Sequence, residues 1–121
     1  MYTYKYIHSH PMSGVPAHWF QILLSLADRH LHGLAITQDV YERTDGHMHL
    51  WPGMLYGALK RMVAEGLVEE IEAPATFVSG GGRPRFYRIT ASGRRCCIAE
   101  VRRMTRNVAA ARTKRLIGRR A

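Results

Sequence analysis

Two stretches, PGMLYGALKRMVAEGLVEE over residues 52–70 and GRPRFYRIT over residues 82–90, decide the fold of this chain of 121 residues. The first stretch predicts a helix, because Pro52 suits a first helical position and Gly66 suits the residue that ends a helix. Apolar side chains recur along it at the three- and four-residue spacing of one helix face. The predicted buried stripe consists of Leu55, Ala58, Leu59, Met62 and Val63.

The residues after this helix predict a β-hairpin. The run from 67 to 73 indicates one strand, and residues 85–89 indicate the returning strand. The loop between them, residues 74–84, contains three consecutive glycines and cannot be helical. A helix that leads directly into such a hairpin is the pattern of a winged helix-turn-helix, which places one helix and one hairpin loop against DNA. The predicted fold class is therefore α+β, mostly α.

Two further helices are predicted upstream. The first spans residues 17–31, and a turn at 32–33 leads into the second, which starts near residue 35 and ends near residue 44. Residues 48–51 are long enough only for a bridging strand. The first helix is predicted from the spacing of Phe20, Leu23, Leu24, Ala27 and Leu31.

The chain ends in a long helix. Thr90 is a good N-cap for it. Apolar residues then recur at alternating steps of four and three, as in a helix that pairs with another helix. We therefore expect an N-terminal arm (1–15), a winged-helix DNA-binding domain (16–90) and a C-terminal dimerisation helix with a basic tail (91–121). The apolar seam consists of Cys97, Val101, Met104, Val108 and Ala111.

The net charge of +9 is placed unevenly. Residues 1–93 carry eight basic and eight acidic side chains, whereas residues 94–121 carry ten basic side chains against Glu100 alone. A basic balance favours a polyanionic partner. Because the expected DNA-binding domain is itself nearly neutral, attraction to DNA and recognition of DNA are predicted to depend on different parts of the molecule.

Composition argues against several classes of protein. No apolar run is long enough to span a membrane, the N-terminus lacks the apolar core of a signal peptide, and the adjacent Cys96 and Cys97 form no disulfide framework, so we expect a cytoplasmic protein. A phosphate-binding glycine loop, a nucleophilic serine motif and a pair of catalytic carboxylates are all lacking. We therefore expect no enzymatic activity, no catalytic residue and no cofactor.

Several motifs occur in the order typical of one family. The chain resembles the PadR family of bacterial transcriptional regulators over residues 18–112, and its single C-terminal helix resembles the smaller subfamily, in which that helix mediates dimerisation. The resemblance implies a repressor that responds to small aromatic or drug-like molecules bound between subunits. Met54 stands where the family usually has Thr, and Leu34 stands where it has an aromatic residue. The motifs are His32-Gly33, Pro52-Gly-x-Leu-Tyr-x-x-Leu59, Glu65-Gly-Leu-Val-Glu69, Gly82-Arg-x-Arg-x-Tyr-x-Ile-Thr90 and Ser92-Gly93.

The outward face of the helix that starts at Pro52 is the candidate DNA-binding surface. Small residues leave this face smooth, so that a duplex can approach the helix closely. Tyr56, Lys60 and Arg61 are predicted to reach phosphates or base edges. The alternative is an ordinary solvated helix face. The small residues are Gly53, Gly57 and Ala64.

The wing supplies the second set of candidates. Arg83 and Arg85 follow three glycines, and an arginine at a hairpin tip can enter a minor groove. The alternative is a solvated loop. We expect Arg88, on the strand itself, to pair with Glu70 or Glu72.

We name the helix that starts at Pro52 the reading helix. A homodimer would present two copies of it to a palindromic operator. The predicted interface consists of Phe20, Cys97, Val101, Met104 and Val108, and Trp19 is the candidate contact for a small aromatic effector. The alternative for Trp19 is a place in the core of the dimer.

Metal and thiol chemistry are weaker candidates. His30-x-His32 and His47-x-His49 each offer two imidazoles, but no further residue completes a site, so no metal is expected. Cys96 and Cys97 lie beside basic residues that lower a thiol pKa, although Cys97 is on the apolar seam. A different class of function also stays open, because a nearly neutral winged helix can bind a protein partner and never contact DNA.

Overall fold

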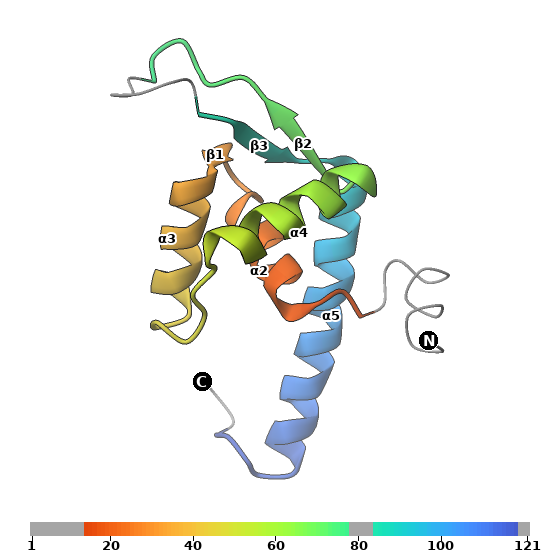
Figure 1. The fold of residues 1–121 in the computed structure, drawn as a ribbon. Coiled ribbons are helices and arrows are strands. Elements are labelled where there is room, and N and C mark those ends of the chain that lie inside the picture. The colour runs from red at the N-terminus through yellow and green to blue at the C-terminus, as the bar shows by residue number, and fades with distance from the viewer. Residues whose placement is uncertain (1–13, 78–83, 119–121) are drawn as a thin grey trace.

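The computed structural model describes residues 14–77 and 84–118. This part of the chain forms an α+β fold in which a small antiparallel sheet with the strand order β1-β3-β2 lies at one end of the helices (Figure 1). The expected arm at 1–15 falls almost wholly outside the described residues, and Arg83 falls outside them too. The elements are α2 (Ala17–Ser25), β1 (Leu31–His32), α3 (Gly33–Arg43), α4 (Pro52–Ala64), β2 (Val68–Ile71), β3 (Phe86–Ile89) and α5 (Ala91–Thr113).

Helix α4 has the limits that its sequence predicts. Pro52 occupies the first turn, and Gly66 ends the helix with a positive φ of 77°. The amide of Leu67 donates to the carbonyl of Met62, which completes a Schellman stop. The prediction was wrong for Val63, which is 38% exposed because it lies at the edge of the apolar stripe.

The bridging strand is not where the sequence suggested. No strand forms at residues 48–51; instead Leu31 and His32 pair with Tyr87 and Phe86 of β3. Helix α2 ends at Ser25, earlier than predicted, which leaves Leu31 available for this pairing. Leu50, which we predicted in the bridging strand, is instead a core residue and is 1% exposed.

The two wing strands are paired in a register that accounts for their acidic and basic side chains. Glu69 lies opposite Arg88, and Glu70 lies opposite Tyr87. Accordingly Arg88 forms its ion pair with Glu69 rather than with the Glu70 or Glu72 that we predicted. Tyr87 belongs to the core. Phe86 is buried on the other face of the sheet, where its ring centroid lies 5.1 Å from that of Phe77.

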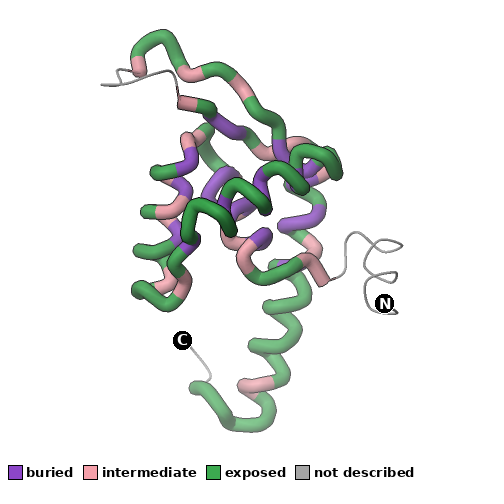
Figure 2. The backbone as a smooth tube through the Cα atoms, viewed as in Figure 1, coloured by how far each residue is buried: buried purple, intermediate pink, exposed green. Residues whose placement is uncertain are grey.

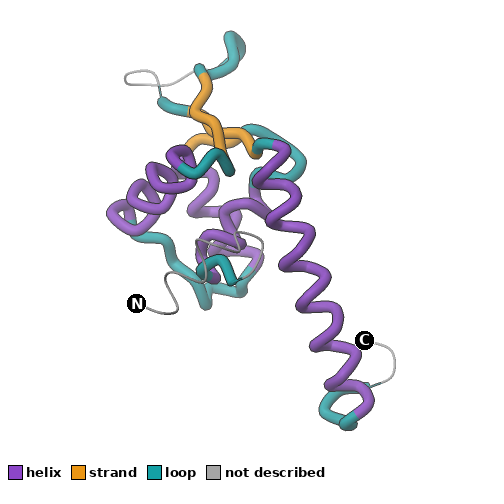
Figure 3. Tube along the Cα trace, turned by 90° about the vertical axis from the view of Figure 1, so that its right-hand side faces the viewer, coloured by secondary structure: helices purple, strands orange, loops and turns teal. Residues whose placement is uncertain are grey.

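Helix α5 has a buried half and an exposed half. Thr90 caps it as predicted, with its hydroxyl accepting a hydrogen bond from the amide of Gly93. Near this end Cys96, Cys97 and Glu100 are buried, whereas the residues from 101 to 110 are all exposed. Figure 2 shows this change along the helix, and Figure 3 shows that the exposed half extends away from the other elements. The first turns of α5 therefore pack into the core that α2, α3 and α4 share.

Candidate nucleic-acid interface

The outer face of α4 is open along its length. Gly53 and Gly57 both lie on it, and a Cβ added at either position would meet nothing within 4 Å. Gly57 is in the helix interior, where glycine costs about 1 kcal/mol relative to alanine. Packing among the described residues gives no reason for this glycine. A partner that approaches the helix backbone closely would give one.

Two basic side chains lie on this face in different settings. Lys60 is exposed and forms no ion pair with any residue in the described ranges. The guanidinium carbon of Arg61 lies 5.8 Å from the centre of the Trp19 ring, a cation–π contact with helix α2. Lys60 is therefore the more available of the two for an external anion.

Tyr56 marks the opposite edge of the face. Its ring is half exposed, and its hydroxyl lies over Gly33, the first residue of α3. Tyr56 also lines an open cleft of about 650 Å³ between α4 and the base of the wing. Arg85 and Tyr87 lie on the wing side of this cleft. Burial raises the pKa of Tyr87, and Glu70 and Tyr56 contribute to the same shift.

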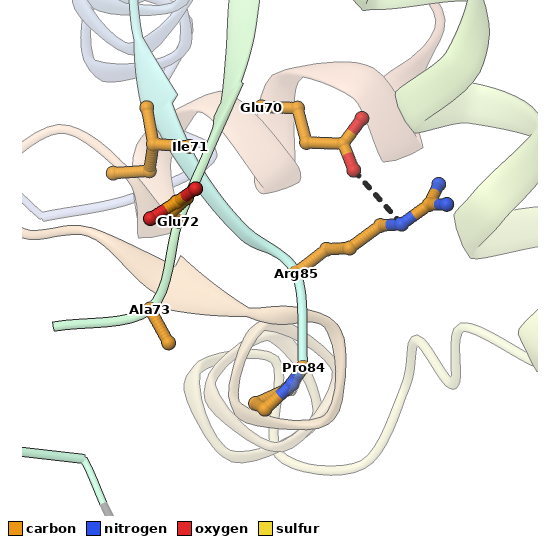
Figure 4. A pocket seen from close by; sticks show the side chains of 6 residues that line it. All are labelled: Glu70, Ile71, Glu72, Ala73, Pro84 and Arg85. Carbon is orange, nitrogen blue, oxygen red and sulfur yellow. Dashed lines mark ion pairs between the residues drawn. The ribbon is translucent and has the colours of Figure 1, made fainter. Parts of the chain in front are cut away.

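Arg85 is already paired within the chain. Its Nε lies 2.9 Å from a carboxylate oxygen of Glu70, and Figure 4 shows the pair bridging from β2 to the residue just before β3. Both side chains remain accessible, since 74% of the Arg85 side chain and 40% of the Glu70 side chain are exposed. An external phosphate would thus compete with Glu70 for this guanidinium, whereas Lys60 has no such competitor.

Sequence reasoning missed an aromatic cluster beside the start of α4. Trp51 is 64% exposed, and its ring stacks on that of His49 at 3.9 Å between centroids and 13° between planes. Tyr41 of α3 contacts His49 edge to face at 5.6 Å. The position of Trp51 directly before the helix could have indicated an exposed aromatic residue beside α4. Instead we predicted a strand at residues 48–51.

The residues predicted for a dimer interface fall into two groups. Val101, Met104 and Val108 are 43%, 42% and 40% exposed along the free half of α5. Phe20 and Cys97 are buried within the chain itself, at 5% and 6% exposure, because α2 packs against the start of α5. These two therefore offer a partner little surface and are removed from the predicted interface.

Trp19 is also part of the core of the single chain. It is 7% exposed and contacts Arg61. An effector therefore cannot reach the indole unless neighbouring side chains move. Its setting nevertheless makes its fluorescence sensitive to events at the α2–α4 contact.

Two of the candidate histidines, His32 and His47, have structural partners. His32 Nδ1 accepts the amide of Ala35 and so caps α3, and a ring nitrogen of His47 lies 2.8 Å from the carbonyl oxygen of Thr44. Among the residues with described positions, no three His, Cys, Asp or Glu side chains gather as a metal site would require. Burial raises the pKa of both Cys96 and Cys97, and for Cys97 it outweighs the lowering effect of Arg94. Cys97 belongs to the core, as its place on the apolar seam suggested, and the alternative of a thiol activated by basic neighbours is not supported.

The helices can also be compared with the thickness of a bilayer. Within residues 14–77 and 84–118, no helix combines the length and the apolar character needed to cross one.

The order of elements, the sheet and the open α4 face define a winged helix-turn-helix protein of the transcription-regulator class. The chain belongs to the transcriptional regulator PadR-like family, whose family model matches residues 22–98. Members of this family regulate transcription and are not enzymes.

The chain is also similar to two uncharacterized bacterial proteins. The chain is 40% identical over 85 residues to an uncharacterized 37.1 kDa protein in transposon TN4556 of Streptomyces fradiae, a match that covers 70% of this chain and 22% of that protein. It is 32% identical over 73 residues to "protein X" of Lysinibacillus sphaericus, covering 60% of this chain and 64% of the relative. The chain thus spans less than two thirds of the length of either.

Solved structures share the fold. A PadR family regulator from Clostridium difficile is 26% identical with a TM-score of 0.58, over 82% of this chain and 99% of that one. RosR of H. salinarum has a TM-score of 0.65 at 24% identity, over 86% and 88% of the two chains. Bacillus subtilis PadR, solved in complex with operator DNA, has a TM-score of 0.62 at 20% identity, over 73% of this chain and 48% of that one.

Proposed function

We propose that this protein regulates transcription by placing α4 in the major groove of duplex DNA. The observation that supports this proposal best is Gly57, an interior helix glycine that no described contact requires. The family assignment and the operator complex of Bacillus subtilis PadR supply the class of partner. A close-fitting duplex accounts for glycine at positions 53 and 57 of this helix face.

Each candidate side chain has a distinct role in the proposal. Lys60, at the centre of the face, binds a backbone phosphate, and Tyr56 and Arg61 contact the duplex at the two edges. Arg85 joins from the wing by exchanging Glu70 for a phosphate. We also propose Arg83 as a wing contact, although it lies outside the described residues.

We further propose that the protein is a homodimer paired through the exposed half of α5. Val101, Met104 and Val108 form an apolar strip there that helix α5 cannot cover by itself. In this arrangement residues 16–90 contact the DNA and residues 91–121 hold the dimer. Two copies of α4 would address half-sites about one helical turn apart, so the operator is palindromic. Regulation is repression in the cytoplasm. A small aromatic effector that displaces the side chains covering Trp19 releases the DNA.

The test is DNA binding measured at several salt concentrations. The full chain is titrated onto a fragment from upstream of its own gene and onto a scrambled fragment of equal length. The proposal predicts preference for the upstream fragment and an affinity that falls linearly with salt on a logarithmic scale. A chain that binds neither fragment at low salt would instead favour the protein-interaction alternative.

A further inference from the structure

Three aromatic rings are arranged so that an exposed indole is held in place beside the first turn of α4. Trp51 is the most exposed large aromatic residue in the described part of the chain. His49 stacks on it, and Tyr41 supports His49 from helix α3. A solvent-exposed tryptophan that is fixed by its neighbours presents an apolar surface at low conformational cost.

Met54 extends this surface onto the helix. It lies in the first turn of α4, three residues after Trp51, and is 46% exposed. The first turn carries no acidic side chain, so nothing in it repels a polyanion. Beyond it the same outward face continues through Gly57 to Lys60. We name Trp51 and Met54 together the apolar tip.

The composition of this end of α4 limits what it can recognise. Residues 51–59 contain no Arg, Lys, Asn, Gln, Asp, Glu, Ser or Thr, which are the side chains that read base edges by hydrogen bonding. The only hydroxyl is that of Tyr56, which lies over Gly33. Apart from the indole N–H of Trp51 and the hydroxyl of Tyr56, the side chains in this part of the helix can contact a base edge only through apolar groups.

The floor of the major groove offers one apolar group, the C5 methyl of thymine. A recognition helix contacts base edges chiefly with its N-terminal residues, which here include the apolar tip. We propose that Trp51 and Met54 select operator sites by contact with thymine methyl groups, with His49 and Tyr41 as positioning residues for Trp51. This inference rests on the proposed function, because it assumes that α4 enters the major groove.

The test removes the methyl groups without changing the base pairs. Duplexes that bind the full chain tightly are selected from a random-sequence pool and prepared with either thymidine or deoxyuridine. Burial of one methyl group corresponds to about a fourfold change in affinity. We therefore expect the wild-type chain to bind the thymidine duplex at least about fourfold more tightly, and Trp51→Ala and Met54→Ala each to reduce that ratio. Leu116→Ala, an exposed apolar control beyond the end of α5, should keep it.

The outcomes separate the two proposals. Equal affinity of the wild-type chain for the two duplexes would overturn the inference while leaving DNA binding intact. A wild-type preference that persists in both Trp51→Ala and Met54→Ala would overturn it as well, because the preference would arise elsewhere. Failure to select any duplex, with no salt-dependent binding, would reject the proposed function itself. The ratio of the wild-type affinities for the thymidine and deoxyuridine duplexes tests the inference even if one variant does not fold.

Discussion

The hydroxyl end of Tyr56 lies directly over Gly33, in the space that a Cβ on Gly33 would occupy. This contact links the start of α3 to the outer face of α4. The obstructing atoms belong to the far end of a half-exposed side chain, so the tyrosine can swing away at little cost. Gly33 therefore sets the position of a candidate DNA contact without itself facing the duplex.

Replacing Gly33 with Ala should displace Tyr56 and weaken operator binding several-fold while leaving the free energy of unfolding within about 1 kcal/mol of wild type. Binding titrations and urea unfolding would measure the two effects. In the Tyr56→Ala background the same Gly33→Ala change should no longer affect binding, because no ring remains to be displaced. Additive losses in the double variant would argue against the link.

Gly57→Ala should have opposite effects on stability and function. The free energy of unfolding should rise by about 1 kcal/mol, because alanine is the better helix former and its Cβ meets nothing in the chain. Affinity for DNA should fall, because that Cβ would hold the helix backbone away from the duplex. Denaturant unfolding and binding assays would show both changes.

Gly93 provides the matched control for this substitution. It also lies in a helix, but a Cβ there would collide with the backbone carbonyl oxygen of Leu67. Gly93→Ala should therefore destabilise the fold by about 1–3 kcal/mol. If Gly57→Ala were to lose stability as Gly93→Ala does, the view that its face is open would be wrong.

Lys60→Ala should weaken binding to every duplex and reduce the slope of log affinity against log salt by about one unit, the contribution of one phosphate contact. Arg61→Ala should also alter the fluorescence of Trp19, because the guanidinium lies over the indole. Arg95→Ala is the control for the loss of one positive charge away from α4, because Arg95 lies on α5 and donates a hydrogen bond to Ser92 there. An unchanged salt slope in Lys60→Ala would remove Lys60 from the interface.

Asp39 should make stability depend on acidic pH. Burial would raise its pKa, but hydrogen bonds from Ser25 and Arg43 and the charges of Arg43 and Arg29 outweigh burial and lower the pKa below 3.8. The pKa of Asp39 is lower in the folded chain than in the unfolded chain. The ionised carboxylate therefore stabilises the fold fully at a pH above the unfolded-state pKa, and this stabilisation is lost as the pH falls through the folded-state pKa.

Asp39→Asn should therefore cost about 1–3 kcal/mol at pH 7 and flatten the loss of stability below about pH 4. Unfolding curves recorded from pH 7 to pH 2 would measure this. Glu42→Gln, an exposed change on the same helix, should leave the profile unaltered. A parallel profile for Asp39→Asn and wild type would contradict the assigned role.

Met104→Glu should dissociate the proposed dimer without unfolding the winged helix, because the side chain lies on the half of α5 that is exposed within the chain. Sedimentation at micromolar concentration would follow the mass, and circular dichroism the fold. Ala110→Glu adds the same charge on the opposite side of α5 and should leave association intact. A wild-type chain that sediments as a monomer would refute this architecture.

The reading helix could be predicted closely because its signals are local. Pro52 and Gly66 set its limits through their own backbone preferences, and Thr90 does the same for α5. The bridging strand could not be placed in this way. Leu31 fits a helical spacing as well as a strand, and only the position of β3 beside it decides which it joins.

The same distinction applies to the candidate site. The sequence alone determined the family pattern, the outward position of Lys60 and the smooth face at Gly57, because helical periodicity fixes which residues share a face. Tertiary structure decided the partners: Arg61 with Trp19, Arg85 with Glu70, Tyr56 over Gly33, and the stacked ring of Trp51. The first three contacts join residues that are far apart in the sequence, and His49, which stacks on Trp51, is itself contacted by Tyr41 of α3. Their formation depends on how the whole chain packs, which no local spacing encodes.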